Sequence, residues 1–177
     1  FIDTRRVGIG GVSQGTFIPL YILQKHDRLT AISISAASWA PEEYYWSTRK
    51  DRESQQSMGY TPWYPKPVGQ GLEFWKKLDI AEHIEQIEAP IVMHHALKEA
   101  YLAARFMRLL ADADKPYDAY IYTDELHQKW QPAHLQSVVQ RNYDWFRFWL
   151  QDKEDPAADK QAQYRRWRVL REKQCTN

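Results

Sequence analysis

The residues from Gly11 to Gly15 read Gly-Val-Ser-Gln-Gly and form a Gly-x-Ser-x-Gly motif between a predicted strand and a predicted helix. A serine on such a strand-to-helix turn projects its hydroxyl above the sheet, and small flanking residues let the neighbouring backbone come close to the turn. The motif therefore predicts that Ser13 is a nucleophile and that the backbone N–H of Gln14 points at a developing oxyanion. The alternative is an ordinary tight turn.

Strands and helices alternate along the rest of the chain. Apolar runs predict strands over residues 6–10, 29–36, 91–96 and 117–123, and helical spacing of apolar residues predicts helices over 14–26, 101–113 and 132–150. This order is typical of an α/β fold with a mostly parallel sheet and helices on both faces. We assign residues 1–150 to this fold.

Two segments depart from the alternation. Residues 39–77 form an excursion rich in proline, glycine and aromatic side chains, with short helices possible over 72–87. Residues 151–177 are polar and form a C-terminal extension, either solvated or docked. Its basic stretch over 165–173 lacks a groove-reading motif, so nucleic-acid binding is not predicted.

Composition excludes several other classes of protein. Hydrophobic residues make up 44% of the chain and charged residues 27%, which indicates a globular chain. The net charge of +1 gives no reason to expect nucleic acid or a membrane surface as a partner. The single cysteine, Cys175, cannot form an internal disulfide, and no Cys/His cluster has zinc-ligand spacing. No apolar stretch reaches the ~18 residues of a membrane span. We expect a soluble protein without a metal ion or cofactor.

A serine nucleophile needs a histidine base and an acid that orients the histidine. In sheets of this type the partners follow in the order serine, acid, histidine, each just past the C-terminal end of a strand. Glu99 follows the third predicted strand and His127 follows the fourth. The sequence therefore predicts a triad of Ser13, Glu99 and His127.

The other candidates fit less well. Asp124 and Glu125 are near His127 but are predicted on its approach strand, from which they cannot easily reach behind the ring. The remaining histidines lie within a predicted strand, at helix ends or in loops, or on the last helix. These are, in that order, His94 and His95, His26 and His83, and His134.

Aromatic side chains are concentrated over residues 39–75, after a strand whose C-terminal end faces the predicted site. Amphipathic aromatics suit a compact, partly apolar ligand. Trp39, Tyr44 and Trp63 are the candidate substrate contacts. Packing of a helical cap on the sheet explains the same residues and is compatible with substrate binding.

Four segments resemble the catalytic domain of the prolyl oligopeptidase family of serine peptidases. They are the Gly-x-Ser-x-Gly motif, the run Met58-Gly-Tyr-Thr-Pro-Trp63 followed by Phe74-Trp75, residues 89–99, and Thr123-Asp-Glu-Leu-His127. In that family a Pro-led strand ends in His-Gly-x-x-Asp, and the catalytic histidine follows a Pro-Asp-Glu-x-His segment. The resemblance covers about residues 5–150 and implies an α/β-hydrolase fold.

This chain departs from the family pattern at two positions. Ala96 replaces the usual glycine and Glu99 replaces the usual aspartate. With residues 127–134, this makes the chain more similar to the lasso-peptide isopeptidases, a bacterial branch that hydrolyses the isopeptide bond closing a macrolactam ring. The resemblance implies a Ser-His-Glu peptidase that works through an acyl-enzyme. The alternatives are a general dipeptidyl, acylaminoacyl or other oligopeptidase of the family, and a non-catalytic binding subunit.

An α/β-hydrolase has several strands before its nucleophile, together with a loop that gives the second oxyanion donor. This chain begins only a few residues ahead of Ser13. We therefore expect it to be the C-terminal piece of a longer protein and to be inactive alone. The resemblance implies that the rest holds the remaining strands and a β-propeller that restricts access. It leaves the compartment open between the bacterial cytoplasm and the periplasm.

Overall fold

The computed structural model describes residues 3–36, 69, 71–77 and 79–176. The described elements are β1 (Gly8–Val12), η1 (Ser13–Thr16), α1 (Phe17–Leu23), β2 (Ala31–Ser35), α4 (Gly71–Lys76), η4 (Ile80–Gln86), β3 (Ile91–Ala96), α5 (Leu97–Asp112), β4 (Tyr117–Tyr122), α6 (Pro132–Gln151), η5 (Ala158–Lys160) and α7 (Gln161–Thr176). The short helices expected over residues 72–87 are α4 and η4.

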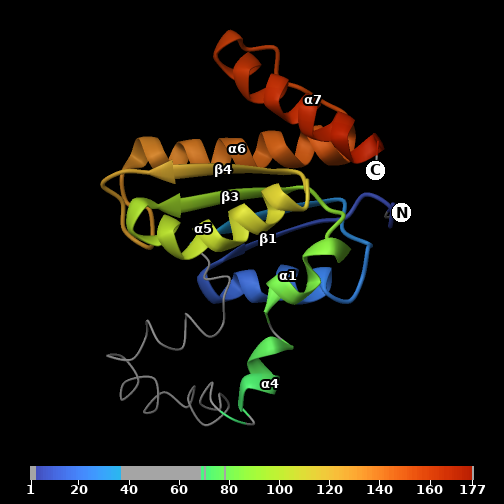
Figure 1. The fold of residues 1–177 in the computed structure, drawn as a ribbon. Helices are drawn as coiled ribbons and strands as arrows, with labels where there is room; N and C mark the ends of the chain where they lie inside the picture. The colour runs from blue at the N-terminus through green and yellow to red at the C-terminus, as the bar shows by residue number, and fades with distance from the viewer. Residues whose placement is uncertain (1–2, 37–68, 70, 78, 177) are drawn as a thin grey trace.

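The four described strands form one sheet in the order β1-β2-β3-β4, and every neighbouring pair is parallel (Figure 1). The predicted parallel sheet is therefore confirmed. Because all four strands run the same way, their C-terminal ends meet at one edge of the sheet. The residues that follow these ends share one region of the molecule.

Helices α1 and α5 cover one face of the sheet. Their apolar side chains pack on the buried residues of β2 and β3, among them Ile32, Ile34 and Met93. Phe106 and Leu110 of α5 lie at the centre of this core, where almost none of their surface is exposed.

Helices α6 and α7 cover the opposite face (Figure 1). Trp145 of α6 and Trp167 of α7 are fully buried, and their rings meet edge to face with centroids 5.0 Å apart. An aromatic side chain buries about 150–250 Å², which at about 25 cal/mol per Å² contributes roughly 4–6 kcal/mol before entropy is counted. The residues after the last predicted helix are therefore docked on α6 by Tyr164 and Trp167 in an otherwise polar segment.

Strand β1 is an edge strand among the described residues. It packs closely under α6, because a Cβ on Gly8 would lie only 2.7 Å from the Phe146 ring. Val139 and Tyr143 lie on the same face of α6 as Phe146, and both are exposed. Val12 at the end of β1 is exposed as well. The open edge of β1 is thus accompanied by uncovered apolar surface.

Several element boundaries differ from the prediction, and three of these differences bear on the site. Strand β1 extends through Val12, so the glycines before Ser13 lie in the strand and not in the turn. Helix α5 begins at Leu97 instead of residue 101, which places Glu99 in its first turn. Strand β4 ends at Tyr122, and Asp124 follows with a positive φ of 55° that breaks the extended backbone.

Within the described part of the chain, no helix is both long enough and apolar enough to cross a membrane.

Candidate active site

Ser13 lies on a strained turn at the C-terminal end of β1. Its φ is 54°, in the left-handed region that a residue with a side chain rarely adopts. The backbone of Gly15 approaches so closely that a Cβ on Gly11 would lie 2.3 Å from the Gly15 carbonyl oxygen. The Thr16 hydroxyl closes the turn by donating to the Ser13 carbonyl oxygen over 2.6 Å.

The two glycines of the motif have different roles in this turn. Gly11 is required for space, since any side chain there would collide with the backbone of Gly15 and Thr16. At Gly15 an added Cβ would meet no atom of the described residues within 4 Å. The expectation that both flanking residues must be small is therefore met at Gly11 and not at Gly15.

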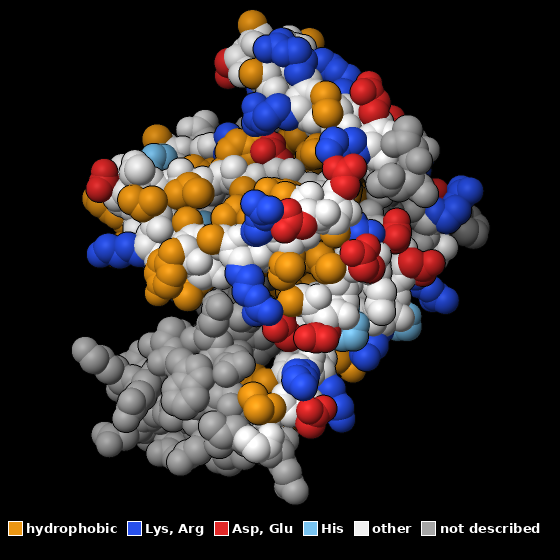
Figure 2. Space-filling view, in the orientation of Figure 1, with side chains coloured by type: hydrophobic (Ala, Val, Ile, Leu, Met, Phe, Trp, Pro, Cys, Tyr) orange, Lys and Arg blue, Asp and Glu red, His pale blue; other side chains and the backbone are white. Residues whose placement is uncertain are grey.

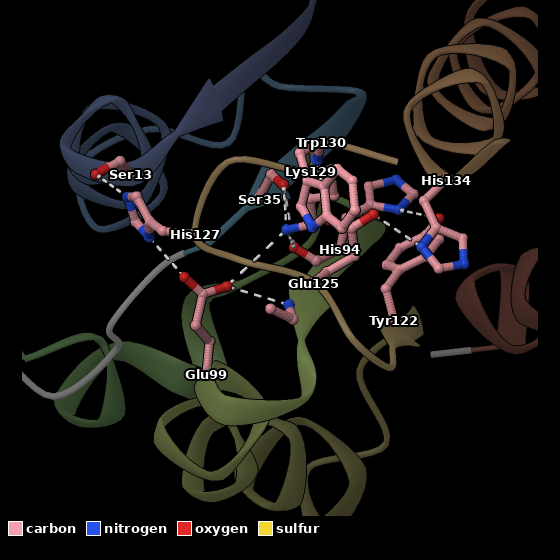
Figure 3. Close-up of polar contacts among 11 residues, drawn as sticks. Ser13, Ser35, His94, Glu99, Tyr122, Glu125, His127, Lys129, Trp130 and His134 are labelled. Atoms are coloured by element: carbon pink, nitrogen blue, oxygen red, sulfur yellow. Dashed lines mark hydrogen bonds and ion pairs between the residues drawn. The ribbon is translucent and has the colours of Figure 1, made fainter. Parts of the chain in front are cut away.

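The structure brings Ser13, His127 and Glu99 together in one hydrogen-bonded line (Figure 3). The Ser13 hydroxyl lies 2.8 Å from His127 Nε2, and His127 Nδ1 lies 2.5 Å from Glu99 Oε1. A carboxylate accepts at Nδ1, so Nδ1 carries the proton and Nε2 is free to accept that of Ser13. This is the arrangement that a serine nucleophile needs.

Glu99 folds back over the start of α5. Its second carboxylate oxygen, Oε2, accepts a hydrogen bond from the Ala96 backbone N–H at 3.1 Å. Ala96 is the residue before the helix and Glu99 is the third residue in it, so this contact is one half of a capping box. The extra methylene of glutamate is taken up by this bend, and Oε1 points at His127.

The loop between β4 and α6 carries His127 and is held by a buried carboxylate. Glu125 accepts hydrogen bonds from the backbone N–H groups of Trp130 and Gln131, at 2.9 and 3.2 Å, and from His134 Nδ1 at 2.8 Å. Burial alone would raise the pKa of the Glu125 carboxyl, but these donors outweigh it and hold that pKa below its ordinary value. Glu125 therefore fixes the loop from within.

The two acidic residues nearest to His127 in sequence are Asp124 and Glu125. Both are in the turn after β4 and not on the strand, which corrects the predicted position. The Glu125 side chain is turned toward the start of α6 and away from the His127 Nδ1 that Glu99 occupies (Figure 3).

His94 and His95 lie inside β3 and are fully buried. His94 Nε2 lies 2.9 Å from Asn142 Oδ1, and its Nδ1 lies 3.3 Å from the Tyr122 hydroxyl. Because Asn142 Oδ1 can only accept, His94 donates from Nε2 and accepts from Tyr122 at Nδ1. Burial and the nearby Arg141 lower the pKa of His94 to about 3, and burial lowers that of His95 to about 4. Both are neutral core histidines.

Other predicted contacts are less defined. Gln14 is exposed in the first turn of η1, where backbone N–H groups have no partner inside the helix. Trp39, Tyr44 and Trp63 lie outside the described residues. Among the residues that the structure describes, no group of three His, Cys, Asp or Glu side chains could hold a metal ion.

Sequence reasoning missed one residue of the site. Lys129 lies beside Glu99 with 5% of its side chain exposed, and its ammonium lies 3.9 Å from Glu99 Oε2. The only sign of Lys129 in the sequence was its position two residues after His127, and a lysine at such a spacing is too common to indicate a role.

Comparison with known proteins identifies the family to which this chain is similar. A model of the prolyl oligopeptidase family matches residues 1–153. The lasso peptide isopeptidase AtxE2 of Asticcacaulis excentricus is 34% identical over 173 residues, which are 96% of this chain and 24% of that protein.

The fold is also similar to those of solved structures. AtxE2 isopeptidase, as a variant with Astexin3-dC4 bound, is 32% identical, with a TM-score of 0.80 over 97% of this chain and 26% of that one. An acylaminoacyl peptidase of Pyrococcus horikoshii is 19% identical, with a TM-score of 0.69 over 89% of this chain and 26% of that one, and shows a shared fold.

The chain therefore spans about a quarter of the length of the relatives it matches. The family model covers most of the chain, including the turn at Ser13 and the segments that carry Glu99 and His127. The chain belongs to the prolyl oligopeptidase family.

Proposed function

We propose that this chain carries the catalytic triad of a serine peptidase that hydrolyses the isopeptide bond of a lasso peptide. The observation that supports it most directly is the hydrogen-bonded line from Glu99 through His127 to Ser13. The substrate class follows from the similarity to AtxE2, a lasso peptide isopeptidase.

In the proposed reaction the Ser13 hydroxyl oxygen attacks the carbonyl carbon of the isopeptide bond. His127 Nε2 takes the hydroxyl proton, and the Glu99 carboxylate stabilises the imidazolium through Nδ1–H. The oxyanion that forms accepts a hydrogen bond from the Gln14 backbone N–H. The imidazolium then gives its proton to the departing amine nitrogen, which leaves an ester of Ser13.

Water completes the cycle by the same route. His127 takes a proton from water as its oxygen attacks the ester carbon, and returns a proton to the Ser13 oxygen as the bond breaks. The products are the freed amine and a carboxylate, so the ring of the substrate is opened.

The surface around the triad suits a partly apolar ligand. Hydrophobic side chains are exposed at the end of the molecule where the strands have their C-terminal ends (Figure 2). Those within three residues of Ser13, Glu99 or His127 in sequence are all more than half exposed: Val12 at the end of β1, Leu97 and Tyr101 on α5, and Leu126 and Trp130 on the His127 loop. Such side chains bind peptides well, because apolar contact with them removes surface from water.

The substrate assignment is tested by comparing a lasso peptide with its linear isomer of the same sequence. We expect the longer protein that contains this chain to open the lasso peptide at the isopeptide bond and to leave the linear isomer intact, as followed by mass spectrometry. Cleavage of the linear peptide at a main-chain bond, with the lasso form untouched, would instead assign a general oligopeptidase.

Ser13→Ala is expected to lower kcat by about 10³-fold or more while substrate still binds, because the acyl-enzyme route is lost. His127→Ala should lower kcat by a similar factor. The double variant should be no worse than either single variant, since the two groups act as one unit. Full turnover by the Ser13 variant would transfer the nucleophile to another residue.

Glu99→Gln keeps the shape of the side chain but removes the charge that stabilises the imidazolium. We expect kcat to fall by about 10²–10⁴-fold with a modest change in KM, and Glu99→Asp to retain partial activity. Asp124→Asn is the matched control and should leave kcat near that of the wild type. Near-wild-type kcat in Glu99→Gln, with activity abolished by Asp124→Asn or Glu125→Gln, would show that another acid orients the ring.

We further propose that the open edge of β1 is completed by preceding residues of a longer polypeptide, whose strands and β-propeller the family resemblance implies. The exposed apolar residues beside β1 support this, because a neighbouring strand and its helices would cover them.

Residues 1–177 expressed alone are therefore expected to show no turnover of an activated ester, whereas the longer protein shows it. Sustained ester hydrolysis by the isolated chain would contradict the need for that completion.

A further inference from the structure

Lys129 is a buried cation placed directly behind the acid of the triad. Its ammonium lies 3.9 Å from Glu99 Oε2, 3.3 Å from the His94 carbonyl oxygen and 3.5 Å from the Ser35 hydroxyl oxygen (Figure 3). These three partners come from α5, β3 and β2. A lysine is rarely buried without partners of this kind, because removing its charge from water is costly.

The Glu99 carboxylate is consequently held from both sides. Oε1 faces His127 Nδ1, while Oε2 accepts from the Ala96 backbone N–H and faces the Lys129 ammonium. Rotation of the carboxylate would break all of these contacts together. A glutamate side chain has one more rotatable bond than an aspartate. The contacts of Oε2 with Ala96 and Lys129 therefore remove conformational freedom that the longer side chain would otherwise have.

The charges around Lys129 also bear on the triad. The titratable groups that face its ammonium are Glu99 on α5, Glu125 on its own loop, and His94 and His95 on β3, both of which are neutral. Burial lowers the pKa of Lys129, and the carboxylates of Glu99 and Glu125 oppose that change. One buried cation therefore balances the negative charge that Glu99 presents to His127.

We propose that Lys129 is a positioning residue for the triad, which fixes the Glu99 carboxylate and balances its charge. The inference rests on the proposed function. A purely structural role, in which Lys129 only ties the His127 loop to the ends of β2 and β3, is the alternative.

The test compares pH profiles of kcat/KM for the longer wild-type protein and for two neutral variants of it, Lys129→Met and Lys129→Gln. The His127 imidazolium must lose its extra proton before Nε2 can accept the proton of Ser13. Without the Lys129 ammonium nearby, the negative charge of Glu99 stabilises the imidazolium more strongly. The acid limb of the profile should therefore move to higher pH by about one unit. We expect kcat to fall roughly 10- to 100-fold, with little change in KM.

Two further variants separate charge from anchoring. Lys129→Arg keeps the charge and should keep the acid limb at its wild-type position. Lys115→Met is the matched control. Lys115 also has a mostly buried side chain, donates to the Glu85 carbonyl oxygen and lies near the Glu88 carboxylate. It precedes the N-terminal end of β4, whereas the site lies beyond the C-terminal end. Lys115→Met should leave the profile unchanged.

An acid limb that stays in place in both neutral variants overturns the inference, even where kcat falls. If neither variant folds, NMR titration of the lysine Cε signals in the wild type decides, because Lys129 must stay protonated throughout the active pH range. Loss of its proton below the pH optimum contradicts the proposal. Failure of the proposed function would show differently, as an absence of turnover by the wild type.

Discussion

The parallel alignment of the four strands is the constraint on which the candidate site depends. Ser13 and His127 are 114 residues apart in the chain, yet their side chains lie 2.8 Å apart. Because β1, β3 and β4 all end at the same edge, the residues that follow them converge without a long loop. Any antiparallel strand among these three would move one member of the line to the opposite edge.

Glu99 shows how local helix structure and the site are combined. Its carboxylate caps α5 through the Ala96 backbone N–H and also binds His127. The start of α5 at Leu97 is therefore part of the site's geometry, since a helix starting later would free Glu99 from the cap. The His127 loop has a comparable internal support in Glu125, which ties it to the beginning of α6.

The sequence was sufficient for the order of the four strands and of the helices between β1 and the end of α6, and for the three residues that the structure brings together, but not for helix α7. Apolar runs and helical spacing locate buried strands and helices well, because burial leaves a regular pattern. The ends of strands and helices were harder to predict where contacts with other elements determine them. Strand β1 continues through its glycines because Gly10, Gly11 and Val12 pair with Ser33, Ile34 and Ser35 of β2, and this pairing is not visible in the sequence.

Charged residues buried by long-range contacts were also hard to predict. Lys129 looks like an ordinary loop residue until its partners on α5, β3 and β2 are known. Glu125 was predicted on a strand, and its contacts with the start of α6 depend on how the loop turns. Tyr164 and Trp167 lie in a stretch with many arginines, so their role in docking α7 was masked by the polar composition around them.

In the proposed reaction, Ser13 is a nucleophile activated by His127. The most direct measurement of this activation is labelling of the longer protein with a fluorophosphonate, followed by peptide mass spectrometry to locate the adduct. A fluorophosphonate phosphonylates a serine only where a neighbouring base activates it. We expect a single adduct, on the peptide that contains Ser13. An adduct on a different serine, or turnover of substrate by a protein that takes no adduct at Ser13, would contradict it.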